Sequence, residues 1–370
     1  MIAMPGRDPA DQAFDPMGQD VIDVRGLLLE RGISAEELDM AAADGLLPLL
    51  VLDALMFSDR PRYDETTLVQ KVGVDVEYAR ALWRAMGFPT AGEGEVVFYE
   101  DDLLALQSAA SEGALAAYDS PGALRAAVVH QTRVMSAALA RIAEQSTDDV
   151  EVVLNALRTR GASEEDIARL IAVTFRLGDF EELLWYMFRR QWRAAAWRRL
   201  ARPAHASGPV VVGFVDLVRF AAITEQVADD ELEQLILRFE ELAHDAITDG
   251  GGRVVKMIGD AVMFVADEPA QATDLAMSLV DAYAHDSLLP PARAGLASGS
   301  ALARDGDYYG PTVNLAARIV DIARPSHVVI SDALHSTLTD ADRYSFRRLP
   351  PKRLKGIGPS TLWAVRHQRH

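Results

Sequence analysis

The stretch RVVKMIGDAVMFVA at residues 253–266 decides the fold of the carboxy-terminal half of this chain. Two apolar runs, Arg253 to Ile258 and Ala261 to Ala266, are separated only by a Gly-Asp dipeptide. This pattern is typical of two antiparallel strands joined by a tight turn. Upstream, apolar residues recur at helical spacing between Leu232 and Ile247, and Val210 to Val215 forms a further β-branched run. Short strands and a long helix in alternation predict an α/β domain.

The composition restricts the class of protein to which the chain can belong. Its 370 residues are enough for two or three domains, and 49% hydrophobic with 25% charged residues is typical of globular proteins. The 37 basic and 55 acidic residues give a formal charge of -18, which repels nucleic acid and anionic lipid unless basic residues cluster locally. No cysteine is present, which excludes disulfides, thiolate nucleophiles and cysteine zinc sites. The most apolar stretch, Gly45 to Phe57, is too short for a membrane span, and the amino terminus is unlike a signal peptide, so we expect a cytoplasmic protein.

The pattern of residues divides the chain into a helical part and a mixed part. Residues 1–16 are rich in proline and aspartate, and we expect them to form a mobile leader. Residues 17–200 carry alanine, leucine, arginine and glutamate at helical spacing, which predicts an all-α domain. Residues 203–209 contain two prolines and a glycine and predict a linker, after which residues 210–370 form the α/β domain.

Residues 63–89 have the helix, glycine turn and second helix of a helix-turn-helix, and they resemble the start of a MerR-type module. A helical packing unit is the alternative. The second helix opens with Asp75 and Glu77, which repel phosphates. Packing is therefore the favoured interpretation, and we expect no stable nucleic-acid partner.

Residues 181–202 predict a basic, aromatic helix that links the two parts. Six arginines lie on it, and Trp185, Phe188 and Trp192 occupy one side. Such a helix can lie on a membrane surface. A connecting helix whose arginines pair with the acidic remainder of the chain is the favoured alternative, because it requires no further partner.

Two carboxylates mark the predicted sheet. Asp216 follows the strand predicted for Val210 to Val215, and Asp260 lies in the turn between the next two strands. Single carboxylates at strand ends are common and do not by themselves indicate a functional site. Two that meet at neighbouring strands supply hard oxygen ligands suited to Mg²⁺ or Mn²⁺ carrying a nucleoside triphosphate.

A second polar group of residues follows Gly310. Pro311 predicts the start of a helix, and Asn314 and Arg318, four residues apart, share one face of it. The neighbouring residues of this helix are apolar. We therefore expect an interface or a cleft on this helix and not complete exposure to solvent.

Five motifs occur in one order, and together they resemble the class III nucleotidyl cyclase catalytic domain. They are FVDL at residues 214–217, KMIGDAVM at 256–263, DYYG at 307–310, VNLAAR at 313–318 and LKG at 354–356. The resemblance runs from about Val210 to Val365 and implies a ferredoxin-like βαββαβ fold. The preceding helical part and linking helix are similar to actinobacterial soluble adenylyl cyclases, whose all-α regulatory domain is autoinhibitory and responds to pH.

The resemblance implies a reaction and a role for each matched residue. ATP would be converted to 3′,5′-cyclic AMP and pyrophosphate with two Mg²⁺ or Mn²⁺ ions per active site. Adenine presents an acceptor at N1 and a donor at N6, which one donor and one acceptor side chain match. The implied assignments are Asp216, Asp260 and the Leu217 carbonyl to the metal ions, Asn314 and Arg318 to catalysis at the ribose and α-phosphate, Lys355 to the terminal phosphates, and Lys256 and Asp307 to the base.

The chain departs from the family pattern just after the first aspartate. Arg219 and Ala221 stand where the family usually has glycine and threonine. A missing glycine hinders the approach of phosphate to backbone amides, and Arg219 either compensates by contacting phosphate or weakens nucleotide binding. The competing hypothesis for the whole chain is a degenerate cyclase domain that binds nucleotide and signals through the amino-terminal half, with the helix-turn-helix-like segment as a link to DNA.

The spacing of Lys256 and Asp260 predicts a homodimer. Only four residues separate them, although one is assigned to the base and the other to the metals at the opposite end of the nucleotide. Two interfacial active sites, each built from both chains, resolve this conflict. We also expect residues 1–200 to restrain the cyclase, with protonation as one candidate signal and His205 as one candidate group.

Overall fold

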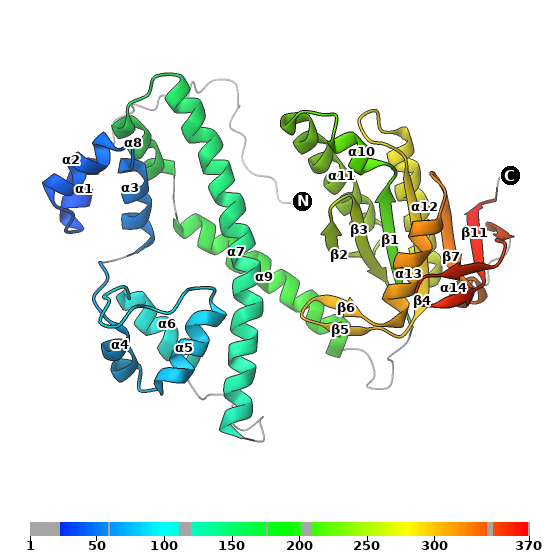
Figure 1. Cartoon of the computed structure of the whole chain (residues 1–370), viewed down its shortest axis with the longest axis horizontal. Coiled ribbons are helices and arrows are strands. Elements are labelled where there is room, and N and C mark those ends of the chain that lie inside the picture. Colours follow the sequence, from blue (N-terminus) through cyan, green and yellow to red (C-terminus); the bar gives the residue numbers. More distant parts are fainter. Residues whose placement is uncertain are drawn as a thin grey trace, which may run out of the picture. The chain divides into compact units, whose positions relative to one another are not determined.

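The chain divides into two compact units, a helical unit at Met1–Ala195 and a sheet unit at Ala196–His370 (Figure 1). The computed structural model describes residues 23–57, 60–110, 120–174, 177–200, 209–338 and 343–368. The predicted leader, residues 203–208 of the predicted linker and His205 lie outside these ranges. No helix within them is long and apolar enough to cross a membrane.

Helices make up the helical unit. Polar side chains begin several of them: Ser34 caps the second helix in a complete capping box, and Asp64, Asp75 and Ser120 each accept a hydrogen bond from the first turn that follows. The helices are α1 (Val24–Glu30), α2 (Ala35–Ala43), α3 (Leu47–Met56), α4 (Glu65–Val72), α5 (Val76–Ala85), α6 (Glu100–Ala110), α7 (Pro121–Thr159), α8 (Glu164–Thr174) and α9 (Leu177–Leu200), the last of which crosses the boundary between the units.

The long helix α7 takes part in two separate small cores. Its carboxy-terminal half joins α1, α2, α3 and α8 around fully buried side chains such as Leu38 and Ile167. Its amino-terminal half meets α4, α5 and α6, whose core includes Leu82 and Leu106. The hydrophobic effect therefore holds the helical unit together at two sites along one helix.

Residues 63–89 form two helices around a tight turn. Gly73, with a φ of 79°, ends α4, and Asp75 caps α5. The same aspartate pairs with Arg125 of α7 at 2.6 Å, and Tyr78 and Leu82 of α5 are buried in the core. These contacts favour the packing interpretation of this segment, because the start of α5 is engaged by α7.

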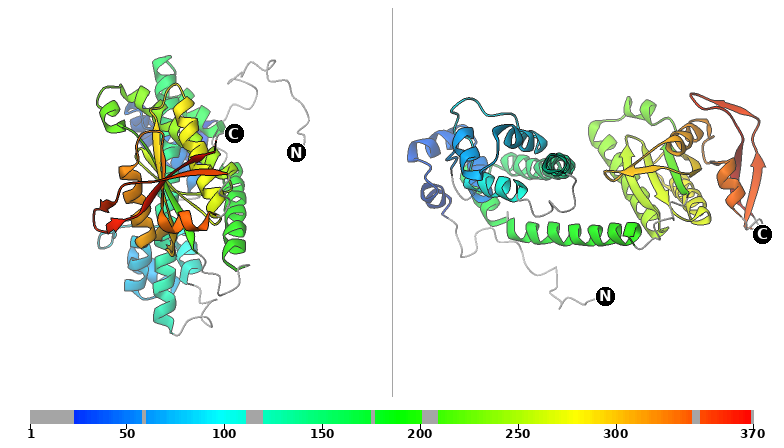
Figure 2. Two further views of the ribbon diagram at one scale, coloured as in Figure 1. Left: turned by 90° about the vertical axis from the view of Figure 1, so that its right-hand side faces the viewer. Right: turned by 90° about the horizontal axis from the view of Figure 1, so that it is seen from below.

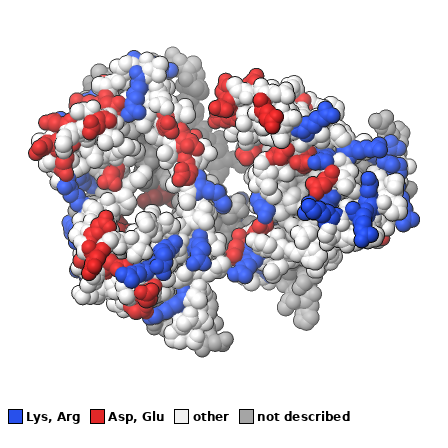
Figure 3. All heavy atoms as spheres, in the orientation of Figure 1, with Lys and Arg blue, Asp and Glu red and all other residues white. Residues whose placement is uncertain are grey.

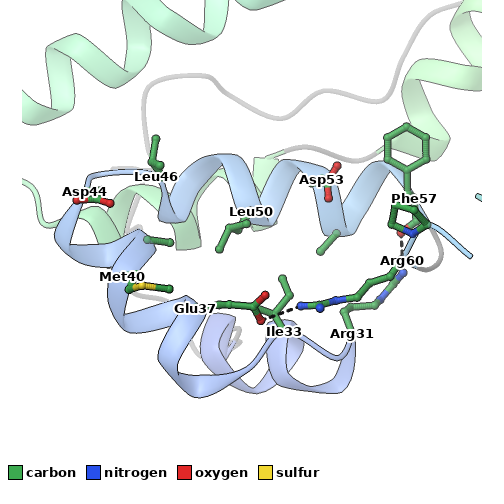
Figure 4. A pocket seen from close by; sticks show the side chains of 13 residues that line it. Arg31, Ile33, Glu37, Met40, Asp44, Leu46, Leu50, Asp53, Phe57 and Arg60 are labelled. Carbon is green, nitrogen blue, oxygen red and sulfur yellow. Dashed lines mark hydrogen bonds and ion pairs between the residues drawn. The ribbon is translucent and has the colours of Figure 1, made fainter. Parts of the chain in front are cut away.

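A cavity of about 470 Å³ lies between α2 and α3 in the helical unit (Figure 4). Arg31 donates to the carbonyl of Phe57 at 3.0 Å, and Arg60 pairs with Glu37 at 2.9 Å. Leu50 and other apolar side chains line the remaining wall. Both arginines of the cavity are thus engaged by the chain itself.

Helix α9 carries the predicted basic and aromatic residues. Trp185, Phe188 and Trp192 are about half exposed or more, the rings of Trp185 and Phe188 stack at 5.4 Å, and the Arg189 guanidinium lies 5.9 Å from the centre of the Trp185 ring. Arg202, the last arginine of the predicted helix, lies outside the described residues.

The sheet unit begins with a strand that is longer than predicted, since the first strand continues through Asp216 to Leu217. The helices are α10 (Phe220–Thr224), α11 (Asp229–Asp249), α12 (Pro269–His285), α13 (Pro311–Ile322) and α14 (Asp332–Thr337). The strands are β1 (Val210–Leu217), β2 (Arg253–Ile258), β3 (Ala261–Ala266), β4 (Ala292–Gly299), β5 (Leu302–Arg304), β6 (Asp307–Tyr309), β7 (Val328–Ser331), β8 (Tyr344–Arg348), β9 (Lys352–Leu354), β10 (Gly358–Ser360) and β11 (Leu362–His367).

The main sheet has seven strands in the order β2-β3-β1-β4-β7-β11-β8. Its first four strands belong to the series β1-α11-β2-β3-α12-β4, and every neighbouring pair among them is antiparallel. This arrangement confirms the predicted ferredoxin-like βαββαβ core and the predicted β2–β3 hairpin. β7 extends the sheet parallel to β4, and the pairs β5–β6 and β9–β10 form two separate ribbons.

Different helices cover the two faces of this sheet. Along β1, Val211 and Val215 belong to the core with α11 and α12, whereas Val212 and Phe214 belong to the core with α13. Figure 2 accordingly shows α12 (yellow) and α13 (orange) on opposite sides of the sheet. Because side chains alternate along a strand, Asp216 continues the row of Val212 and Phe214 onto the α13 face.

A glycine lets α13 lie directly on β4. A Cβ added at Gly295 would lie 2.2 Å from the backbone nitrogen of Val320, so a larger residue would push the helix away. The close packing brings the end of α13 to Arg293 of β4, whose Nη1 donates to the carbonyl of Asp321 at 2.9 Å. Helix and strand therefore meet beside Asp216.

Candidate active site

The structure brings Asp216, Leu217 and Asp260 together where β1 ends beside the β2–β3 turn. Asp216 lies opposite Ala261 of β3, and Asp260 occupies the β2–β3 turn, where Gly259 has a φ of 59°. The N–H of Leu217 donates to the carbonyl of Asp260 at 3.0 Å. The β-ladder and this hydrogen bond hold the two aspartates on neighbouring chain segments.

Arg293 is a site residue that the sequence analysis missed. On β4 it lies directly opposite Asp216, and its Nε and Nη2 donate to Oδ2 of that aspartate at 2.8 and 2.6 Å. The signal in the sequence was a lone charge within a run of small and apolar residues, ARAGLASG at 292–299. Its meaning depends on the register between β1 and β4, which the residues alone do not disclose.

The environment of Asp216 disfavours its ionised form. Burial raises the pKa of Asp216, the ion pair with Arg293 opposes this rise, and the charges of Asp260 and Asp321 add to it. A divalent cation carries more positive charge than a guanidinium. It would therefore compete with both the proton and Arg293 for this carboxylate.

Lys256 and Asp307 form a second charged pair on the same face of the sheet. Lys256 of β2 lies opposite Met263, whose side chain packs in the α13 core, and its Nζ lies 2.5 Å from Oδ2 of Asp307 on β6. The N–H of Tyr308 donates to the other carboxylate oxygen at 2.7 Å. The structure thus joins the two residues assigned to the base, although 51 residues separate them in sequence.

The pKa of Asp307 shifts in the opposite direction to that of Asp216. Partial burial raises the pKa of Asp307, but the hydrogen bonds from Lys256 and from the Tyr308 N–H outweigh burial, so the pKa lies below its ordinary value. This carboxylate stays ionised at neutral pH. It can therefore accept a hydrogen bond from an amine such as adenine N6.

Asn314 and Arg318 project from an exposed part of α13. Arg318 pairs with Asp321 at 3.2 Å within the helix, and both Asn314 and Arg318 are exposed. Within the described part of the chain, no hydrogen bond or ion pair joins them to Asp216 or Lys256. The structure therefore does not bring these two residues into contact with either charged pair.

Lys355 lies in the turn of the β9–β10 ribbon, where it is exposed and precedes Gly356 with a φ of 78°. Residues 343–368 contain seven lysines or arginines and no aspartate or glutamate. In Figure 3 basic side chains gather at this end of the sheet unit, whereas acidic side chains gather over the α11 end. A chain with a net charge of -18 thus carries a local basic segment that attracts phosphate.

The donor set around Asp216 and Asp260 fits a metal ion that arrives with its substrate. Among the residues that the structure describes, no three His, Cys, Asp or Glu side chains form a cluster that could hold a metal alone. Mg²⁺ usually takes one or two carboxylates and completes its shell with water and substrate phosphates. Two carboxylates and the Leu217 carbonyl on adjoining segments match that requirement.

Known proteins resemble this chain over both units. An adenylate cyclase of Streptomyces coelicolor is 33% identical over 293 residues, which cover 78% of this chain and 75% of the relative. A pH-sensitive adenylate cyclase of Mycobacterium tuberculosis is 31% identical over 356 residues, covering 92% and 86%. The crystal structure of the adenylyl cyclase CyaB from P. aeruginosa aligns with 44% of this chain and 96% of its own, at 20% identity and a TM-score of 0.39.

The family model for the adenylate and guanylate cyclase catalytic domain matches residues 203–367, which hold the sheet and every site residue described above. The sheet unit is therefore a cyclase catalytic domain preceded by a helical domain, and the chain belongs to the class III nucleotidyl cyclase family.

Proposed function

We propose that this protein converts ATP to 3′,5′-cyclic AMP and pyrophosphate at two sites shared between the chains of a homodimer. The observation that carries the proposal is the separation of the two charged pairs on one chain. Asp216 pairs with Arg293 between the central strands β1 and β4, and Lys256 of the edge strand β2 pairs with Asp307 of the β5–β6 ribbon. Each chain thus offers one group suited to metal and phosphate and another suited to a base.

Two Mg²⁺ or Mn²⁺ ions at Asp216, Asp260 and the Leu217 carbonyl would lower the pKa of the ribose 3′-hydroxyl and neutralise the triphosphate. A cation at Asp216 would compete with Arg293 for that carboxylate and would release the guanidinium to interact with the phosphates. The hydrogen bond from its Nη1 to the Asp321 carbonyl keeps the guanidinium beside the site during this exchange.

The reaction joins the ribose 3′-oxygen to the α-phosphorus and breaks the bond between the α-phosphorus and the bridging oxygen of pyrophosphate. The 3′-hydroxyl proton leaves to solvent. Arg318 meets negative charge that develops on the α-phosphate in the transition state, where a cation lowers the barrier most. Asn314 orients the ribose, and Lys355 holds the terminal phosphates.

Lys256 and Asp307 select adenine over guanine. The ammonium donates to N1 and the ionised carboxylate accepts from N6, whereas guanine presents the opposite pattern at these positions. The lowered pKa of Asp307 supports this role, because a protonated carboxyl would lose its acceptor character towards the amine.

A homodimer completes each site. In this arrangement Asp216 and Asp260 of one chain face the base-selecting and catalytic residues of the other, which are Lys256, Asp307, Asn314, Arg318 and Lys355. The exposure of Asn314 and Arg318 supports this division, since exposed side chains on one helix face are accessible to a nucleotide held by a second chain.

The direct test is to incubate the purified full chain with ATP and Mn²⁺ or Mg²⁺ and to measure cyclic AMP, with GTP as the matched control. We expect cyclic AMP from ATP and far less cyclic GMP. Nucleotide binding without any cyclic product, under either metal, would instead support the degenerate binding module.

The helical unit is proposed to restrain this activity, with α9 as the connecting element and pH as one candidate signal. The name of the Mycobacterium tuberculosis relative, a pH-sensitive adenylate cyclase that aligns with 92% of this chain, supports pH as the candidate signal. The comparison is between the full chain and a chain that begins near His205, each assayed across pH. A higher rate or a different pH profile without the helical unit is expected, and identical rates and profiles would exclude the restraint.

A further inference from the structure

Arg219 adopts a backbone conformation that its side chain disfavours. Its φ of 64° and ψ of 23° lie in the left-handed region, which glycine enters freely and arginine does not. Within the described ranges, the only other non-glycine residues with positive φ are Asp305 and Ser326. Glycine would adopt this conformation at lower cost than arginine.

The surrounding chain prevents Arg219 from relaxing. On one side, the N–H of Val218 donates to the carbonyl of Pro291 at 3.0 Å. On the other, the Arg219 carbonyl accepts from Ala222 at 3.1 Å, and the Phe220 side chain is buried in the core with α11 and α12. Strain that the surroundings enforce is a known feature of ligand-binding sites.

The guanidinium of Arg219 is uncommitted. It is exposed and has no hydrogen-bond or ion-pair partner among the residues that the structure describes, whereas Arg293 is held by Asp216. Arg219 lies three residues after Asp216, on the segment that leaves the end of β1. A triphosphate bound at Asp216 and Asp260 would bring several negative oxygens to this segment.

We infer that Arg219 is a phosphate-binding residue. Its guanidinium contacts the terminal phosphates of the nucleotide, whereas a glycine at this position would leave the backbone amides accessible to them. Guanidinium and phosphate form paired, charge-assisted hydrogen bonds, which a lysine reproduces only in part. The inference rests on the proposed function, since it assigns the triphosphate to Asp216 and Asp260.

The experiment compares Arg219→Gly and Arg219→Lys with the wild-type full chain. Calorimetric titration with inorganic tripolyphosphate and Mg²⁺ reports the phosphate site without any turnover. We expect Arg219→Gly to bind tripolyphosphate about tenfold more weakly, Arg219→Lys to lie in between, and the affinity for adenosine to stay unchanged. Thermal denaturation of Arg219→Gly should give a melting temperature at least as high as that of the wild type, because the strain is removed.

Ser326→Gly is the matched control, since Ser326 has a φ of 57° and is exposed between α13 and β7. Its strain should be relieved in the same way with no change in tripolyphosphate affinity. Equal or tighter tripolyphosphate binding by Arg219→Gly would overturn the inference, as would a wild-type chain that binds no tripolyphosphate.

The two proposals fail in distinguishable ways. Weaker tripolyphosphate binding by Arg219→Gly, in a chain that makes no cyclic AMP, would leave the inference standing and remove the cyclase function. Cyclic AMP formation by the wild-type chain, together with an unchanged tripolyphosphate affinity in Arg219→Gly, would support the cyclase function and overturn the inference about Arg219.

Discussion

Two aspartate–cation pairs lie on the same face of one sheet, yet their carboxylates behave in opposite ways. The pKa of Asp216 is raised by burial and by two neighbouring carboxylates, despite its ion pair with Arg293. Burial also raises the pKa of Asp307, but the hydrogen bonds from Lys256 and Tyr308 bring it below the ordinary value. An ion pair alone therefore does not determine the state of a carboxylate; the balance of burial, other charges and hydrogen bonds does.

The difference matches the two tasks proposed for these pairs. A carboxylate that is costly to ionise gains from a divalent cation, which suits Asp216 to metal binding. A carboxylate that stays ionised through its hydrogen bonds is a ready acceptor, which suits Asp307 to recognition of an amine. Substitutions at the two pairs test whether the carboxylates differ in this way.

The largest effect is expected for Asp216→Asn. Loss of a metal-binding carboxylate should reduce cyclic AMP formation about 10³-fold or more. Because the folded-state pKa of Asp216 is raised, its ionised form costs stability at pH 7, and asparagine removes that cost. Activity measured beside thermal denaturation should therefore show a lost reaction with no loss of melting temperature.

Asp274→Asn provides the matched control for that variant. Asp274 on α12 pairs with Arg343, and α12 covers the opposite face of the sheet. This variant should keep its activity even where its melting temperature falls. Full activity in Asp216→Asn, or a comparable loss in Asp274→Asn, would contradict the assignment of Asp216 to the metal site.

The next largest effect concerns the choice of base. Lys256→Glu combined with Asp307→Cys should lower ATP turnover by about 10²-fold or more, because unpaired polar groups against the wrong base edge are costly. Affinity for tripolyphosphate, measured on the same protein, should change little. Intact ATP turnover in the double variant would show that this pair does not read the base.

The smallest effect concerns stability and pH at the same pair. The folded-state pKa of Asp307 is depressed, so the pair contributes stability above the unfolded value near 4 and loses it as pH falls through the folded value. Lys256→Met should lower the free energy of unfolding by less than about 1 kcal/mol at pH 7, because the lysine is largely solvated. Denaturant unfolding should show this difference vanishing in more acidic solution.

Arg304→Met is the control for the pH experiment, since it removes a more exposed ion pair with Asp305 on the neighbouring ribbon. Its effect on unfolding should be smaller still. A difference between wild type and Lys256→Met that grows in acid would mean that the pair does not stabilise the ionised form of Asp307.

The parts of the fold that the sequence predicted are those with strong local signals. The helix α11 and the β2–β3 hairpin followed from an apolar period of 3.6 residues and from the Gly-Asp turn. β4 was not predicted, because its alanines and glycines give a weak strand pattern. One of these glycines, Gly295, has no side chain and so allows α13 to pack directly on the strand. β1 was predicted two residues short, since the charged Asp216 ends the β-branched run, although β3 and β4 pair with it on both sides.

Site residues that are distant in sequence could be predicted to lie together only from the motifs of a known family. Asp216 and Asp260 were singled out by their places at strand ends. The contact between Lys256 and Asp307 links β2 of the main sheet to the β5–β6 ribbon, far apart in the chain, and only the family resemblance pointed to it. The pairing of Arg293 with Asp216 was not predicted, because it depends on strand register, which is a property of the folded sheet. The roles of all the assigned residues stay predictions, and Asn314, Arg318 and Lys355 form no hydrogen bond or ion pair with the two charged pairs within the described part of the chain.

Mixing two inactive proteins shows whether each active site takes residues from two chains. Asp216→Ala and Asn314→Ala should each be inactive alone. In a mixed dimer one site carries both lesions and the other carries neither. With random exchange about half of the dimers are mixed, so roughly a quarter of wild-type cyclic AMP formation should return. Verified exchange of subunits with no recovered activity would contradict shared sites.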